Sequence, residues 1–223
     1  VTQVEGPRFS RHKLPEQFCN VERLLEGMKR RNLDGIVVST SYNVYYLSGF
    51  SGIAHKSDEP RPYAVVISRH APDRPVLLLA DYYVSSLMSQ PTWIADIRSF
   101  RAVMLPLDLP PGENDIDRFI SPASRKNGWA QSVRHNFSDS MSAACRGALA
   151  DVGLSRGRVA FDDMRFGFQL EWDGVEVVDG YDPMMYARAV KTEHEVTMLK
   201  RSTALNQAAI EKSIASWQRG MTW

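Results

Sequence analysis

The chain has 223 residues, which is enough to bury the core of one domain and still leave residues for a connecting segment. Hydrophobic residues make up 43% of it and charged residues 24%, as in ordinary soluble globular proteins. The formal net charge of +1 provides no field that would recruit nucleic acid or an acidic membrane. No apolar run approaches the ~20 residues of a membrane span, and the N-terminus lacks the regions of a signal peptide. The sequence therefore predicts a cytoplasmic protein that binds neither nucleic acid nor membrane.

The N-terminal part begins with polar residues and then shows a helical pattern. Residues 1–14 are polar and irregular and predict a flexible arm. A helix is predicted from Pro15, because proline favours the first helical turn and apolar residues follow at helical spacing. These apolar residues are Val21, Leu24, Leu25 and Met28. The helix should end between Asn32 and Gly35 and lead into a buried strand over residues 35–39.

Residues 40–50, with the sequence TSYNVYYLSGF, are predicted to form a capped turn after this strand. Ser or Thr at the start suits a helix N-cap, Val44 to Leu47 can form one or two helical turns, and Gly49 can end them. Four aromatic residues give the turn a large apolar surface with hydroxyl groups. They are Tyr42, Tyr45, Tyr46 and Phe50. On the residues alone, the favoured interpretation is a strand, a capped turn and a second strand.

The middle of the chain predicts a hairpin followed by a helix and a strand. A charged loop over residues 51–62 precedes two apolar runs, at 63–68 and 76–80, that predict strands. The segment between them is rich in turn residues and favours an antiparallel hairpin. The near-continuous apolar character of both runs predicts strands that are covered on both faces. A helix is then predicted over 81–90, and a further strand over 93–100.

Residues 101–137 are the least regular part, because four prolines interrupt them, and only residues 115–120 predict a short helix. Apolar residues at helical spacing then predict a helix over 141–152. Two further strands are predicted at 158–162 and 175–178. Strands that alternate with helices, apart from the one hairpin, predict an α/β fold with a mixed sheet.

The last segment predicts one long helix. Thr192-x-x-Glu195 has the capping-box pattern, with acidic residues in the first turn and basic residues late, as the helix dipole favours. The helix should span about 26 residues, which is about 39 Å at 1.5 Å per residue. Its apolar stripe consists of Val196, Leu199, Ile210, Ile214 and Trp217. On the residues alone, this stripe packs either on the domain or on a partner copy of the chain.

Two of these stretches carry a family resemblance. The run from Asn43 to Phe50, NVYYLSGF, resembles the signature of the N-terminal domain in the creatinase, prolidase and aminopeptidase P family, and Arg188-x-x-Lys191-x-x-x-Glu195 resembles its junction with the catalytic domain. The resemblance implies a roughly six-stranded mixed sheet flanked by helices over residues 15–187. It also implies that residues 188–223 form the junction and the first helix of a metallohydrolase domain whose remainder is absent. We therefore expect the chain to be a fragment.

The residues supply no recognisable catalytic set. The resemblance implies two divalent ions (Mn, Co or Zn), held by two Asp, one His and two Glu of the missing domain, and none of those motifs occurs in this chain. The five histidines are scattered, and His194-Glu195 lacks the second histidine of H-E-x-x-H. Asp162 and Asp163 are adjacent, so in a strand they would face opposite sides, and a turn role is favoured. We expect no catalytic residue, metal site or cofactor within these residues.

The two cysteines, Cys19 and Cys145, are too few for a disulfide framework and have no CxxC partner. Both fall on predicted apolar helix faces. A reduced role in the core is therefore expected rather than a chemical one.

The resemblance also implies a role at the partner subunit's active site. In creatinase-like members an Arg-Pro-Tyr after the signature lends its arginine to a substrate carboxylate across the dimer, and Arg61-Pro62-Tyr63 matches this motif. The preceding residues 58–60 depart from the creatinase pattern, which counts against creatine as the substrate. The alternative for Arg61 is a surface charge at the start of a strand. We expect Arg61 and His55 to bind substrate in trans, because the arginine fork suits a carboxylate.

Two functions from different classes follow from the resemblance. In the first, the chain is the non-catalytic N-terminal domain of a homodimeric Xaa-Pro peptidase or creatinase-like C–N hydrolase, and it mediates dimerisation and selects a peptide or small-molecule substrate. In the second, it belongs to a relative without metal ligands that acts as a peptide-binding or chaperone-type module. A lyase of the same fold is a further alternative. The metal ligands encoded downstream of Trp223 would distinguish the first function from the second.

Overall fold

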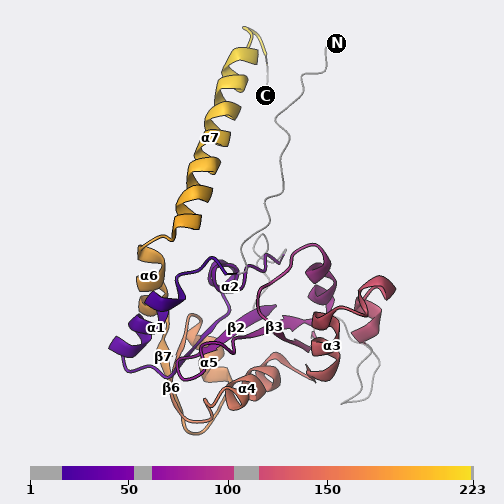
Figure 1. The fold of residues 1–223 in the computed structure, drawn as a ribbon, viewed down its shortest axis with the longest axis vertical. Helices are drawn as coiled ribbons and strands as arrows, with labels where there is room; N and C mark the ends of the chain where they lie inside the picture. The colour runs from indigo at the N-terminus through magenta and orange to yellow at the C-terminus, as the bar shows by residue number, and fades with distance from the viewer. Residues whose placement is uncertain (1–16, 53–61, 103–115, 222–223) are drawn as a thin grey trace.

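The computed structural model describes residues 17–52, 62–102 and 116–221 (Figure 1). The strands are β1 Gly35–Val38, β2 Tyr63–Ser68, β3 Val76–Ala80, β4 Asp96–Phe100, β5 Phe137–Ser138, β6 Gly157–Phe161 and β7 Val175–Asp179. The α-helices are α1 Val21–Arg30, α2 Ser41–Ser48, α3 Gly128–His135, α4 Met141–Asp151, α5 Met164–Gln169, α6 Tyr181–Ala189 and α7 Glu193–Ser216. The 3₁₀ helices among the described residues are η2 Asp81–Met88, η3 Ile116–Phe119 and η4 Pro122–Ser124.

The strands form one mixed sheet in the order β5-β4-β3-β2-β1-β6-β7. Strand β2 is antiparallel to β1 and β3, and the remaining neighbours are parallel. The predicted hairpin is therefore confirmed, and so is the mixed α/β sheet. The sheet has seven strands where about six were expected.

The central strands are buried on both faces, as their continuous apolar runs predict. Every residue of β1, β2 and β3 is buried. Figure 1 shows α2 above the sheet and α4 below it. Because six strands run the same way, their C-terminal ends meet at one side of the sheet, which we call the carboxyl edge. The antiparallel β2 begins there, since Tyr63 pairs with Leu79 near the end of β3.

Several predicted boundaries are wrong. The first helix begins at Val21, not at Pro15, because the side chain of Asn20 accepts a hydrogen bond from the Arg23 N–H and so caps the helix. The helix predicted over 81–90 is a 3₁₀ helix over residues 81–88, and the following strand begins at Asp96 instead of Trp93.

The segment predicted as irregular contains the helix α3. Its two buried residues, Ala130 and Val133, give too weak a periodic signal for a sequence-based prediction. The helix is fixed by a tertiary contact, because Ser132 Oγ accepts from the Ile97 N–H at 3.1 Å and donates to the Ile97 carbonyl at 2.8 Å. Such a contact depends on residues 35 positions away and cannot be seen in a local pattern.

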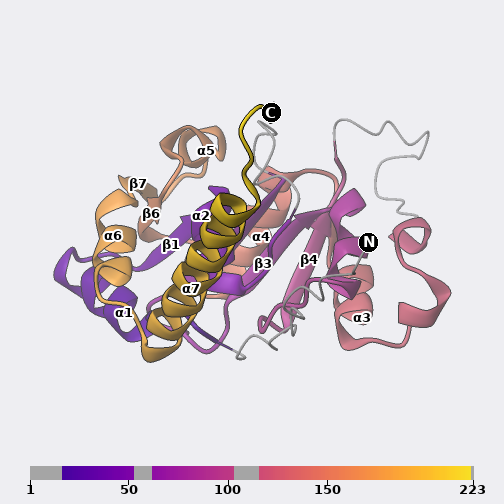
Figure 2. The same cartoon turned by 90° about the horizontal axis from the view of Figure 1, so that it is seen from above.

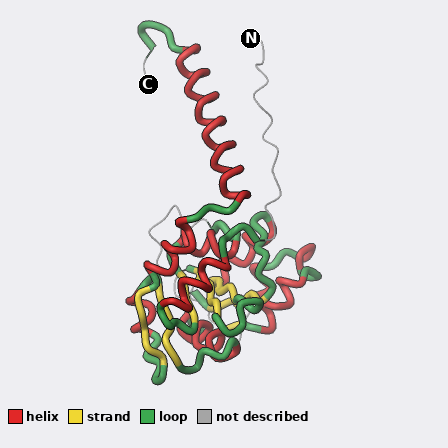
Figure 3. The backbone as a smooth tube through the Cα atoms, turned by 60° about the vertical axis from the view of Figure 1, so that its left-hand side comes forward, coloured by secondary structure: helices red, strands yellow, loops and turns green. Residues whose placement is uncertain are grey.

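The final helix α7 projects from the sheet domain (Figures 1 and 3), and the view from above looks along it onto the sheet (Figure 2). The predicted capping box is confirmed, because Thr192 Oγ1 accepts from the Glu195 N–H and the Glu195 carboxylate accepts from the Thr192 N–H. None of its 24 residues is buried. Within the described ranges, no helix combines the length and apolar content that crossing a membrane requires.

Candidate functional site

The carboxyl edge gathers polar residues that follow directly on the strands. In open α/β sheets, ligands bind in crevices beyond the carboxyl ends of the strands, so this edge is the first place to look for a site. Each of the parallel strands ends in or is followed by a polar side chain here. The residues are Ser39, Asp81, Arg101, Asp139, Asp162 and Asp179.

Asp162 is the most heavily bonded of these residues. Its Oδ1 accepts from the backbone N–H of Ser39 at 2.8 Å. Its Oδ2 accepts from the Thr40 N–H at 3.1 Å, from Thr40 Oγ1 at 2.6 Å and from Asn43 Nδ2 at 2.9 Å. The carboxylate therefore fixes the turn from β1 into α2, and its negative charge lies at the positive N-terminal end of that helix.

A second link connects this carboxylate to α6. Arg188 Nη1 donates to Asn43 Oδ1 at 3.2 Å, while the amide nitrogen of Asn43 donates to Asp162. Asn43 therefore bridges a cation on α6 and an anion at the end of β6. Both Asn43 and Arg188 belong to the two stretches that carry the family resemblance.

Asp163 has a separate role, because its side chain accepts from the Arg165 N–H at 3.0 Å and caps α5. The two adjacent carboxylates thus hold the starts of two different helices. This agrees with the preference for turn chemistry over a paired catalytic function.

The base of α7 is held by a group of contacts that we call the junction cluster, formed by Phe18, Asn20, Tyr46 and Thr192. The Tyr46 hydroxyl accepts from the Asn20 N–H at 2.9 Å and donates to the Ala187 carbonyl at 3.4 Å. Thr192 Oγ1 donates to the Phe18 carbonyl at 3.1 Å. Burial raises the pKa of Tyr46 to about 12, so its hydroxyl keeps the proton that it donates.

Three aromatic contacts extend this cluster. The Phe18 ring lies 5.4 Å from the ring of Tyr45, 6.3 Å from Tyr46 and 6.3 Å from His194, measured between centroids. The family-signature helix α2 thus contacts the first turn of α7 through Phe18. The direction in which α7 leaves the domain is set by these packed side chains and hydrogen bonds.

The apolar residues of α7 lie on two opposite faces of the helix. The predicted stripe is exposed, with Ile214 at 70% and Trp217 at 74% exposure. Leu205 follows Val196 by nine positions, which at 100° per residue places it about 180° away. It is 44% exposed. A helix that is apolar on opposite faces is typical of one that packs between other elements.

The predicted substrate-binding residues, Arg61 and His55, lie outside the described residues. The chain on either side of them is firmly packed at the carboxyl edge. The rings of Phe50 and Tyr63 meet edge to face at 5.9 Å. Gly52 has no room for a side chain, since a Cβ there would lie 2.6 Å from the Tyr63 ring.

The buried thiols are not nucleophiles at neutral pH. Burial raises the pKa of Cys19 to about 11 and that of Cys145 to about 12. Both are free and buried, as the sequence predicts. They therefore act as small apolar residues.

The described part of the chain contains no group of three His, Cys, Asp or Glu side chains that could hold a metal ion. The two-metal centre that the family resemblance implies for the following domain therefore has no counterpart among the described residues. The arrangement at the carboxyl edge is suited to hold segments in place, and the exposed α7 is suited to contact another structure.

Residues 20–173 match the family model described as the Creatinase/Prolidase N-terminal domain. Comparison with curated proteins gives no significant match.

The solved structures that share the fold include two from one archaeon and one from a bacterium. A dipeptidase from Pyrococcus horikoshii OT3 has 18% identity and a TM-score of 0.53, with 89% of this chain and 44% of that chain covered. The prolidase from the same organism has 15% identity and a TM-score of 0.54, with 91% and 44% covered. The Xaa-Pro dipeptidase from Bacillus anthracis has 15% identity and a TM-score of 0.52, again with 91% and 44% covered. The present chain thus spans less than half the length of each.

Proposed function

Because the chain belongs to the creatinase/prolidase N-terminal domain family, we propose that it serves as the non-catalytic N-terminal domain of a metal-dependent hydrolase. The enzyme would cleave an Xaa-Pro peptide bond or, as creatinase-like relatives do, a C–N bond in a small guanidino or cyclic amidine compound. The fold shared with a prolidase and an Xaa-Pro dipeptidase favours the peptide substrate. Two divalent ions would be held by the domain that follows α7.

The observation that carries this proposal is the exposure of α7. Its apolar side chains occupy opposite faces and none of its residues is buried. A second copy packed along one face would leave the other face in water, whereas a following domain can cover both. The junction cluster holds the base of the helix, so that domain would have a defined position relative to the sheet.

The domain would act at its partner's active site in a homodimer. Arg61 and His55 would then bind the substrate across the dimer, and the arginine would take an anionic substrate end. We propose the cytoplasm as the location of the protein. Both thiols are free and buried, as is usual for proteins in that reducing compartment.

Cysteine labelling tests whether α7 is covered. Leu205→Cys and Ile214→Cys place single thiols on the two apolar faces, and the native thiols are buried and protonated, so the background is low. We expect a maleimide to label both positions rapidly in residues 1–223 and at least a hundredfold more slowly in the full-length protein. The rates are measured by mass spectrometry of the labelled peptides.

Lys126→Cys, on the exposed surface near α3, is the matched control and should label at the same rate in both proteins. Equal rates for Leu205→Cys and Ile214→Cys in the two proteins would contradict the proposal. Protection at Ile214 alone would indicate a partner on one face only, and would also contradict it.

A further inference from the structure

Strand β7 is an open edge of the sheet. It is the last strand in the sheet order and pairs only with β6 among the strands that the structure describes. Its sequence, VEVVD, is rich in β-branched residues and contains neither Pro nor Lys, the residues that most often block such an edge. An open edge of this kind can pair with an added extended segment.

The backbone groups that point outward can be identified from the pairing with β6. The Gly174 carbonyl accepts from the Gly157 N–H at 2.9 Å, and the Gly180 N–H donates to the Phe161 carbonyl at 2.8 Å. In a parallel strand, the N–H and the carbonyl group of one residue point to the same neighbouring strand, and those of the next residue point to the opposite side. The even-numbered residues of β7 therefore direct their backbone groups toward β6. Val177 and Asp179 therefore direct their N–H and carbonyl groups away from the sheet.

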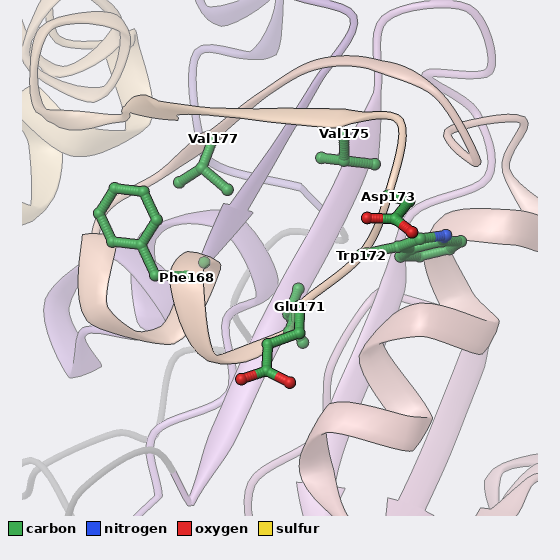
Figure 4. A pocket seen from close by; sticks show the side chains of 8 residues that line it. Phe168, Glu171, Trp172, Asp173, Val175 and Val177 are labelled. Carbon is green, nitrogen blue, oxygen red and sulfur yellow. The ribbon is translucent and has the colours of Figure 1, made fainter.

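An apolar groove lies beside this edge, between β7 and α5 (Figure 4). It has a volume of about 250 Å³. Val175 and Val177 line one side, Phe168 lies at one end and Trp172 at the other. Phe168 is 62% exposed, so a large apolar side chain is available for contact. An added strand would place alternate side chains over this groove.

The charged residues that line the groove are acidic. They are Glu171 and Asp173, and both are exposed. Two further acidic residues are exposed on the strand itself: Glu176, which forms an ion pair with Arg158 at 3.1 Å, and Asp179. A second β7 would bring the same acidic residues against these, and like charges at an edge oppose such pairing. A basic segment would instead be attracted.

We propose that β7 and the adjoining groove bind an extended peptide in which apolar residues alternate with Lys or Arg. The peptide adds a strand to the sheet through Val177 and Asp179. Its apolar side chains contact Phe168, Val175 and Val177, and its basic residues lie near the acidic rim. The site uses none of the residues assigned to substrate binding or to α7, so it does not depend on the proposed hydrolase function.

Binding is tested with the full-length protein and a fluorescein-labelled peptide of sequence Lys-Val-Lys-Val-Lys-Val-Lys, by fluorescence anisotropy. We expect saturable binding that weakens with added salt, and at least tenfold weaker binding by Glu171→Lys/Asp173→Lys. The double variant Asp73→Lys/Glu22→Lys makes the same change in net charge at exposed positions elsewhere and should bind as the native protein does. A peptide with Glu in place of Lys should not bind.

Amide hydrogen exchange tests the backbone pairing without a change in sequence. The peptide should slow exchange at Val177 and Asp179 at least tenfold and leave Glu176 and Val178, which already bond to β6, unchanged. The proposal is wrong if the peptide fails to bind, if reversing the rim charges has no effect, or if protection appears elsewhere. Concentration-dependent protection of Val177 without peptide would also overturn it, since the occupant would then be a second copy of the chain.

Discussion

Replacement of Asp162 by alanine is expected to lower the free energy of unfolding of residues 1–223 by about 3 kcal/mol, since each lost hydrogen bond to a charged group contributes about 1.5–3 kcal/mol. The carboxylate accepts from two backbone N–H groups, at Ser39 and Thr40, and from the side chains of Thr40 and Asn43. Alanine would leave these donors without their acceptor at the start of α2. Urea denaturation followed by circular dichroism measures the loss.

Two variants make this measurement specific. Asp162→Asn keeps one acceptor oxygen and should be destabilised by less than Asp162→Ala. Asp173→Ala removes an exposed carboxylate and should change stability by less than about 0.5 kcal/mol, as is usual for surface substitutions. If Asp162→Ala were no more destabilising than Asp173→Ala, Asp162 would not hold the turn between β1 and α2.

If the proposed function holds, replacement of Arg61 by alanine in the full-length protein is expected to reduce kcat/KM for an anionic substrate about ten- to a hundredfold. A charge-assisted hydrogen bond contributes about 1.5–3 kcal/mol, and each 1.4 kcal/mol corresponds to about a tenfold change. The loss should appear mainly in KM, because the contact would bind an end of the substrate away from the scissile bond. Arg61→Lys should restore part of the activity, since an ammonium group cannot form the forked contact.

The hairpin offers a matched control at its opposite end. Arg74 is exposed in the turn between β2 and β3, whereas Tyr63, two residues after Arg61, begins β2 at the carboxyl edge. Arg74→Ala should leave kcat/KM unchanged. Unchanged kcat/KM for Arg61→Ala with every accepted substrate would show that Arg61 is only a surface charge.

The centre of the sheet could be predicted from the sequence because its strands are buried on both faces. Continuous apolar runs identify β1, β2 and β3 without reference to the rest of the chain. The sequence signals for two helix ends are equally local. Gly49 adopts φ +73° at the end of α2, and Thr192 and Glu195 form a capping box at the start of α7. Both follow from the chemistry of residues within four positions of each other.

The short helices α3, α5 and α6 could not be predicted in this way. Each has only two or three buried residues, so no periodic pattern is visible. They are stabilised by contacts with distant segments. An example is Gly180, which leads into α6 and where a Cβ would lie 2.8 Å from the backbone of Phe161. Such close packing explains the glycine only after the fold is known.

The contacts at the carboxyl edge also separate into local ones, which the sequence predicts, and distant ones, which it does not. Adjacent acidic residues at the end of a predicted strand were visible as turn formers, but the partners of Asp162 lie 119 to 123 positions earlier. Ser39 and Thr40 follow β1, and Asp162 follows β6, so pairing of β1 with β6 brings them together. The sequence contains no direct indication that these two strands are neighbours.

A rate measurement decides whether this chain is the non-catalytic domain of a metal-dependent hydrolase. Hydrolysis of Xaa-Pro dipeptides and of guanidino and cyclic amidine compounds is measured with Mn²⁺, Co²⁺ or Zn²⁺, for the full-length protein and for residues 1–223. We expect metal-dependent turnover by the full-length protein that EDTA abolishes, and no turnover by residues 1–223. Turnover by residues 1–223 after repurification would contradict it, as would the absence of metal-dependent hydrolysis of every substrate by the full-length protein.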